Sequence, residues 1–290
     1  MQSIKFTTSA GSVVIDDRNS YSAAGERIFR LNDFDGNSAK TRIEAVNCIN
    51  MPGQRVLETT ADVKTVIAKI SFAPVYYNNG WFGSAGDRGM YALRREVLRR
   101  FPLGAAGELV YTNDMAAYSI RARVDQIPVV TVKDGNLCEC TIMFTCDYPY
   151  WSRAVDSSEE SIFGSGTHLF IPPSYGDITS PLSGIITCTE SMSGSGVNNI
   201  RFRIVDTENL FNRIDFCGSL LEGQVLKFNN GYNNEWTCSV NGIPNTSMIY
   251  YVDYVEPCAV IPNISKLRFD LLCSGALNVK LTYHNLYIAV

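Results

Sequence analysis

The sequence has no long hydrophobic run. Purely apolar stretches end after a few residues, as at Leu271-Leu272-Cys273, whereas a membrane-spanning helix needs about 20 apolar residues. The pattern therefore predicts no transmembrane helix. The segment Met1 to Phe6 also has no charged region followed by an apolar stretch, so we expect no secretory signal and synthesis in the cytoplasm.

Histidine is scarce, and the cysteines do not have metal-type spacing. The chain of 290 residues has two histidines, His168 and His284, and nine cysteines without a Cys-x-x-Cys pair. Because zinc sites use closely spaced Cys and His ligands, we predict no metal site. Cys138, Cys140 and Cys146 fall at even spacing on an expected strand. We interpret them as buried reduced thiols that pack as small apolar side chains.

Catalytic motifs are also missing. There is no Gly-x-Ser-x-Gly elbow, P-loop or dinucleotide fingerprint. A serine or cysteine nucleophile needs an imidazole nearby, and we interpret both histidines as strand residues. The carboxylate pair of a glycosidase meets only in space, and the sequence marks no such pair. We expect no enzyme activity, no catalytic residue and no cofactor.

The sequence also lacks a strong charge of one sign. The net charge is −4. Residues 1–153 have 18 basic and 16 acidic residues, a net +2, and residues 154–290 have 7 and 13, a net −6. Neither half has the positive field of a dedicated nucleic-acid binder. The length suggests about two domains, and the 46% of hydrophobic residues is enough to build their cores.

Strand periodicity dominates what is present. In Lys64–Phe72, apolar residues alternate with Lys69 and Ser71 on the other side. The same period of two recurs in Tyr118–Val124, Leu137–Cys146, Ile200–Ile204, Leu267–Cys273 and Val279–His284. This period indicates sheets with one buried and one solvated face.

One segment has a helical period instead. In Met90–Phe101 the apolar residues recur on one helical face, with Asp87 as the expected N-cap and Pro102 and Gly104 as the stop. The opposite face has four arginines, Arg94, Arg95, Arg99 and Arg100. They could contact nucleic acid or an acidic neighbour, or they could be a solvated helix face.

An aromatic, glycine-rich loop precedes this helix. Its candidate partner-contact residues are Tyr76, Tyr77, Trp81 and Phe82. Exposed aromatic side chains supply large contact area at low entropy cost. The same residues could equally cover the edge of their own sheet, and both interpretations stay open.

Composition changes after Trp151. Ser152–Gly166 is polar and has little to bury, so we place a boundary near Arg153, giving domains 1–153 and 154–290. Many short strands with regular turns in the second domain predict a β-sandwich or jelly roll. Within it, Tyr232, Asn234 and Trp236 combine aromatic rings with an amide and form a candidate sugar platform, although an Asn-Asn turn explains the same residues.

Read in order, the chain resembles the phage distal tail protein family, which is known from siphophage-type tails and phage-like contractile particles. The first half carries the likeness in Gly25–Phe29, Lys64–Phe72, Arg94–Arg100, Gly107–Tyr111 and Tyr118–Val124, and above all in its ending, Phe144–Trp151. In the second half, Asn241-Gly242, Ile261–Asn263 and Leu281–Tyr287 resemble the family's galectin-like or carbohydrate-module-like domain.

The resemblance implies a mainly β chain. It would have an N-terminal β-barrel or sandwich domain with one amphipathic helix, and a C-terminal galectin-like β-sandwich. We also expect Tyr148–Trp151 to anchor the two domains to each other.

The resemblance further implies a structural virion protein, located in the virion tail and assembled in the host bacterial cytoplasm. It would form a homohexameric distal tail ring that joins the tail tube to the tail tip or baseplate. The implied partners are the tail tube protein, the tip or baseplate hub protein and a receptor-binding protein, with DNA passing through the bore without specific binding. A host surface glycan is a further candidate partner, and a carbohydrate-binding adhesion protein is the alternative function.

Overall fold

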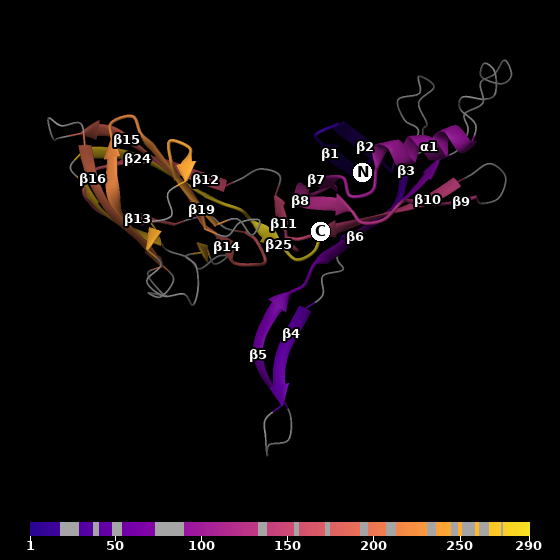
Figure 1. Ribbon diagram of the computed structural model, residues 1–290, viewed down its shortest axis with the longest axis horizontal. Coiled ribbons are helices and arrows are strands. Elements are labelled where there is room, and N and C mark those ends of the chain that lie inside the picture. Colours follow the sequence, from indigo (N-terminus) through magenta and orange to yellow (C-terminus); the bar gives the residue numbers. More distant parts are fainter. Residues whose placement is uncertain are drawn as a thin grey trace. The chain divides into compact units, whose positions relative to one another are not determined.

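The computed structural model describes residues 1–17, 29–36, 41–47, 54–72, 90–132, 138–153, 157–171, 175–191, 197–206, 213–230, 236–244, 249–250, 259–260, 267–273 and 275–290. The chain divides into two compact units (Figure 1). Unit 1 comprises Met1–Ala154 and Ile288–Val290, and unit 2 comprises Val155–Tyr287. The chain therefore passes between the units twice.

Seven strands of unit 1 form a closed sheet. They are β1 (Ser3–Thr8), β2 (Gly11–Asp16), β3 (Arg30–Asp35), β6 (Lys64–Phe72), β7 (Ala106–Thr112), β8 (Ala117–Val124) and β10 (Cys138–Cys146). Neighbours follow the order β8-β7-β1-β2-β3-β6-β10, and β10 pairs back with β8 at Phe144↔Val124 and Thr145↔Arg123. All these pairs are antiparallel except β2 with β3, which meet at Asp16↔Arg30. The result is a small barrel closed through two narrow seams.

Four strands and a helix complete the described part of unit 1. β9 (Val129–Val132) extends the sheet beyond β10, and β11 (Trp151–Arg153) pairs with β8. β4 (Thr41–Asn47) and β5 (Gln54–Ala61) form a hairpin between β3 and β6 along the chain. The helix α1 (Met90–Arg100) ends just before Pro102, and Gly104 has a φ of 76°, which suits glycine.

The interior of the barrel is filled by every second strand residue. The buried residues of β10 run from Cys138 to Cys146, and β6 supplies buried partners opposite them. Phe6, Phe101 and Phe144 pack together with ring centroids 5.1, 6.0 and 6.2 Å apart. Because Phe101 directly follows α1 and Val97 is fully buried, the helix packs over this aromatic cluster. The expectation that Cys138, Cys140 and Cys146 are buried free thiols is confirmed.

Unit 2 is a sandwich of two antiparallel sheets. The six-stranded sheet has the order β12 (Ser157–Phe163), β24 (Gly275–Tyr283), β15 (Ser183–Ser191), β18 (Val225–Asn230), β19 (Trp236–Val240) and β20 (Ile243–Pro244). The five-stranded sheet has the order β13 (Gly166–Phe170), β23 (Leu267–Cys273), β16 (Val197–Asp206), β17 (Arg213–Leu221) and β21 (Ile249–Tyr250). The short strands β14 (Ser180–Pro181) and β22 (Ala259–Val260) pair with each other, and β25 (Leu286–Tyr287) bridges to Ile178.

The core of unit 2 lies between these sheets. The six-stranded sheet contributes Leu226, Phe228 and Leu281, and the five-stranded sheet contributes Phe269 and Leu271 to the same buried cluster. Gly184 lies opposite Phe228 in register, and a Cβ at this position would collide with the phenylalanine ring. This packing is that of a β-sandwich. The predicted fold class, mainly β with one amphipathic helix in the described chain, is confirmed.

Candidate assembly surface

The hairpin of β4 and β5 is a two-stranded sheet of its own (Figure 1). Its register runs from Thr41↔Ala61 to Asn47↔Gln54, with a bulge between Glu44 and Ala45. Within the described residues, neither strand pairs with a third strand. A lone hairpin of this kind is only marginally stable in water, so its outer edges are candidates for pairing with another chain.

Strand β9 is a second open edge. It pairs with β10 from Val132↔Cys138 to Val129↔Thr141, and no further strand of the described chain lies beyond it. Val129 and Ile127 are each 59% exposed. The strand, Val129-Val130-Thr131-Val132, contains neither charge nor proline, the features that usually protect an edge from other chains. We did not predict this strand from the sequence, although a β-branched run between Pro128 and Lys133 is a recognisable strand signal.

The arginines of α1 are divided between pairing and exposure. Arg99 Nη2 and Arg100 Nε approach the Glu96 carboxylate at 2.8 and 2.6 Å, and the Arg100 guanidinium lies 5.5 Å from the centre of the Phe29 ring. Burial raises the pKa of Glu96, but the bonds from Arg99 and Arg100 outweigh it and hold the pKa below its usual value. Arg94 and Arg95 are exposed.

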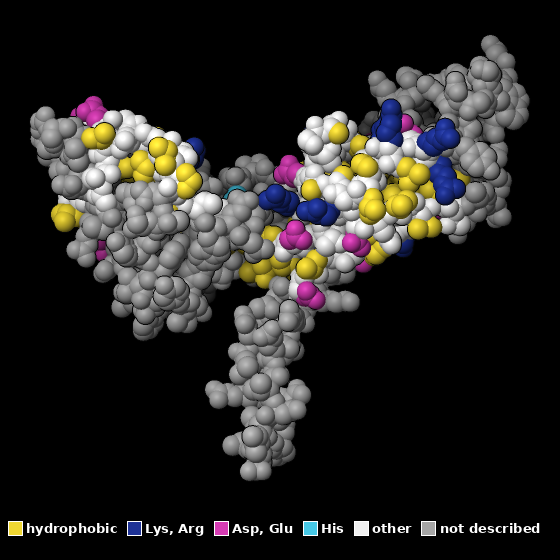
Figure 2. Space-filling model, viewed as in Figure 1, with side chains coloured by type: hydrophobic (Ala, Val, Ile, Leu, Met, Phe, Trp, Pro, Cys, Tyr) yellow, Lys and Arg dark blue, Asp and Glu magenta, His cyan; other side chains and the backbone are white. Residues whose placement is uncertain are grey.

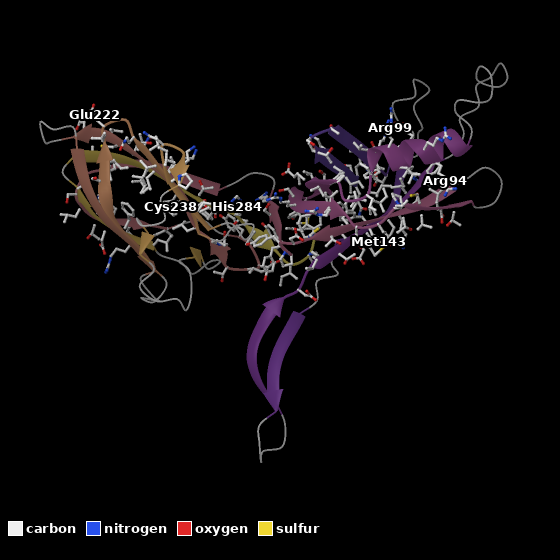
Figure 3. All side chains as sticks on the ribbon, viewed as in Figure 1. Arg94, Arg99, Met143, Glu222, Cys238 and His284 are labelled. Atoms are coloured by element: carbon white, nitrogen blue, oxygen red, sulfur yellow. The ribbon has the colours of Figure 1, made fainter. Side chains whose placement is uncertain are left out.

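Basic side chains gather over α1 in Figure 2, and Figure 3 labels Arg94 and Arg99 at separate points of the helix. Both interpretations of the four arginines, a solvated helix face and a contact with a partner, therefore stay open. Arg99 and Arg100 pair with Glu96 of the same helix, and the exposed Arg94 and Arg95 could contact an acidic neighbour.

The outer face of the six-stranded sheet in unit 2 carries a polar row. Ser183 is in register with Asn229 on one side and Thr282 on the other, and Thr237 follows Asn229. Ser183 Oγ donates to Asn229 Oδ1 at 3.2 Å, and Thr237 is exposed. Hydroxyl and amide groups in such a row can hydrogen-bond to a polar ligand.

Most of the candidate site residues lie outside the described chain. This holds for Tyr76, Tyr77, Trp81 and Phe82 of the loop before α1, and for Tyr232 and Asn234 of the sugar platform. Trp236 opens β19, and its backbone is in register with Asn230. Asp87, the expected N-cap of the helix, also lies outside the described residues. These assignments stay predictions.

The interpretation of both histidines as strand residues is right for His168 and wrong for His284, which directly follows the last residue of β24, Tyr283. His168 lies in β13, with its Nε2 3.1 Å from the Gly164 carbonyl oxygen, and the backbone N–H of His284 donates to Ser180 Oγ at 3.0 Å. Among the described residues, no group of three His, Cys, Asp or Glu side chains is arranged to hold a metal ion. No helix in that part of the chain is long and apolar enough to span a membrane.

Trp151 is fully buried within unit 1. Its indole Nε1–H donates to the Gly36 carbonyl at 3.0 Å, and its ring meets Phe34 edge-on at 5.9 Å. Beside it, Ser152 in β11 and Ser119 in β8 share a buried hydroxyl contact at 3.0 Å. The role of Tyr148–Trp151 as an anchor between domains stays a prediction.

A closed sheet covered by one helix, followed by a two-sheet sandwich, defines the class of this protein as a two-unit, mainly β chain. Among solved structures, the Dit protein of phage SPP1 matches 97% of this chain with 98% of its own, at a TM-score of 0.61 and 9% identity. The baseplate of phage p2 in its activated conformation contains a chain that covers 97% of this one with 98% of its own, at a TM-score of 0.44 and 11% identity.

No family model matches the chain, and no curated protein matches it in sequence. The likeness to the SPP1 protein is therefore one of fold. At that level the resemblance to the phage distal tail protein family is confirmed, across both units.

Proposed function

We propose that this chain is a structural, non-enzymatic subunit of a phage tail or phage-like particle, and that it forms the distal tail ring between tail tube and tip or baseplate. The observation that carries the proposal is the fold likeness over 97% of the chain to a protein described as a paradigm of the hub adsorption apparatus of phages that infect Gram-positive bacteria. The likeness includes both units, so it supports a shared architecture and not one shared domain.

The open edges of unit 1 supply the means of assembly. Ring formation needs a head-to-tail interface in which two different surfaces of one copy meet on neighbouring copies. The hairpin β4–β5 and the strand β9 are two different surfaces, and the outer backbone groups of each face no further strand of the described chain. Strand addition between neighbours would satisfy these groups. We propose a homohexamer closed in this way.

In the proposed particle, unit 1 stacks on the tail tube protein and on the tip or baseplate hub, and unit 2 holds a receptor-binding protein. The net charge of +2 in residues 1–153 suits a bore through which DNA passes without specific binding. The protein would assemble in the host bacterial cytoplasm and remain in the virion tail.

Light scattering of the purified chain, combined with negative-stain microscopy, tests the ring. We expect particles of six or twelve copies of the 32.1 kDa chain, visible as rings with a central hole. A strict monomer at high protein concentration would contradict the ring.

The polar row Ser183, Asn229, Thr237 and Thr282 favours one alternative, a carbohydrate-binding adhesion protein that acts through unit 2. A glycan array probed with the full chain separates the two functions, because adhesion predicts binding without rings. If the chain binds a glycan, if this binding is lost in Asn229→Ala, and if light scattering shows monomers, then the adhesion function is correct and the ring is not.

A further inference from the structure

Lys64 is a buried cation at the end of strand β6. Its relative exposure is 0%, although lysine is almost never fully buried without a partner. The side chain occupies the inward series that continues with Val66 and Ala68. A charge in this position needs a compensating acceptor, because burial of an unpaired ammonium group is costly.

The acceptor comes from the last residues of the chain. Lys64 Nζ donates to the backbone carbonyl of Ile288 at 2.6 Å, across 224 positions of sequence. The same ammonium group lies 5.7 Å from the centre of the Trp151 ring, a distance at which a cation is attracted to an aromatic face. Lys64 is thus held between a neutral carbonyl and an indole ring.

Gly36 contacts both Trp151 and Val290 beside the Lys64 side chain. Its carbonyl accepts the Trp151 indole hydrogen at 3.0 Å. A Cβ on Gly36 would lie 3.1 Å from Trp151 Cζ2 and 3.2 Å from Val290 Cγ2, closer than ordinary contacts. Gly36 therefore leaves room for Val290. We name Lys64, Trp151 and Gly36 the tail socket.

We infer that the tail socket is a binding site for the chain's own closing segment, Ile288–Val290. The segment belongs to unit 1, whereas Val155–Tyr287 before it form unit 2. Unit 2 is consequently attached at both of its ends, by the Ala154–Val155 connection and by the socketed segment. A pull on unit 2 is then carried by two segments of chain instead of one.

Carboxypeptidase Y digestion of the full chain tests this inference. Mass spectrometry of the intact protein measures the rate at which Val290 and Ala289 are released. Lys64→Met removes the donor and keeps an apolar stem. We expect the closing segment to be trimmed at least tenfold faster in this variant than in the unaltered chain. Lys69→Met is the matched control, because Lys69 lies on the same strand but is exposed and paired with Asp33 at 2.8 Å. It should leave the rate unchanged.

Equal trimming rates in the unaltered chain and in folded Lys64→Met would overturn the inference. If circular dichroism shows that Lys64→Met does not fold, Gly36→Ala decides, because its added methyl group competes with Val290. Faster trimming in Gly36→Ala supports the socket, and an unchanged rate overturns it. Protection that disappears on dilution of the unaltered chain would also overturn it, because the segment would then come from a second copy.

Discussion

Lys64 shows how one residue can set the pH response of unit 1. Burial lowers the pKa of its ammonium group to about 8, while the negative charge of Asp35 on β3 opposes that shift. Burial also raises the pKa of Cys146 to about 12, so the thiol stays protonated while Lys64 titrates. The neutral amine retains N–H groups that can still donate to the Ile288 carbonyl.

The free energy of unfolding should therefore rise with pH through this lysine. Between the folded pKa of about 8 and the unfolded value of 10.5, the unfolded chain binds more protons than the folded chain, so raising the pH favours folding. We expect the difference in unfolding free energy between the unaltered chain and Lys64→Met to increase by up to about 3 kcal/mol from pH 7 to pH 10.5. Urea titrations at several pH values measure it, and a difference independent of pH would contradict this role.

The period of two in β6 predicts part of the environment of Lys64. Lys64 has the same parity as Val66, Ala68, Ile70 and Phe72, so the period of two already places it on the inward face. The period gives the face of a residue and not its partner. The carbonyl of Ile288 comes from a segment far along the chain, and nothing in the local sequence of either segment indicates that contact.

For single helices and strands, strong local periodicity was sufficient to predict their type and their bounds. β6 has the predicted bounds Lys64–Phe72, and α1 covers Met90–Arg100 of the predicted Met90–Phe101. Ser119 alternates with the buried Ile120 in β8, yet it is itself buried, because β11 brings the Ser152 hydroxyl to it at 3.0 Å. Pairing between strands distant in sequence therefore decides the burial of Ser119. Such pairing also leaves β9 at the edge of its sheet.

The edge of β9 gives a prediction about assembly. Val129→Lys places a charge on an uncharged edge strand, a change that opposes pairing with another chain. We expect the variant to fold. The protein concentration at which rings form, measured by light scattering, should rise at least tenfold. Val14→Lys is the matched control: Val14 is 60% exposed, like Val129 at 59%, but its strand β2 lies between β1 and β3. Rings of equal stability in both variants would exclude β9 from the interface.

For the whole molecule, the sequence indicated two β-rich parts, but it did not indicate that the chain returns to unit 1 at Ile288–Val290. Tyr283 and Leu286 are buried with unit 2, yet Ile288–Val290 belong to unit 1. The change occurs within a few residues. The packing around Lys64 and Gly36 assigns the final residues to unit 1.

Two separate cores should give two separable unfolding transitions. Phe144 packs with Phe6 and Phe101 in unit 1, and Leu281 belongs to the buried cluster of unit 2. Truncation of either core side chain to alanine should cost about 2–5 kcal/mol, which lowers the midpoint of a domain of this size by roughly 10 °C. In scanning calorimetry, Phe144→Ala should lower one transition and Leu281→Ala the other. Equal displacement of both transitions by either variant would show a single cooperative core. In that case, the double attachment of unit 2 would transmit stability as well as load.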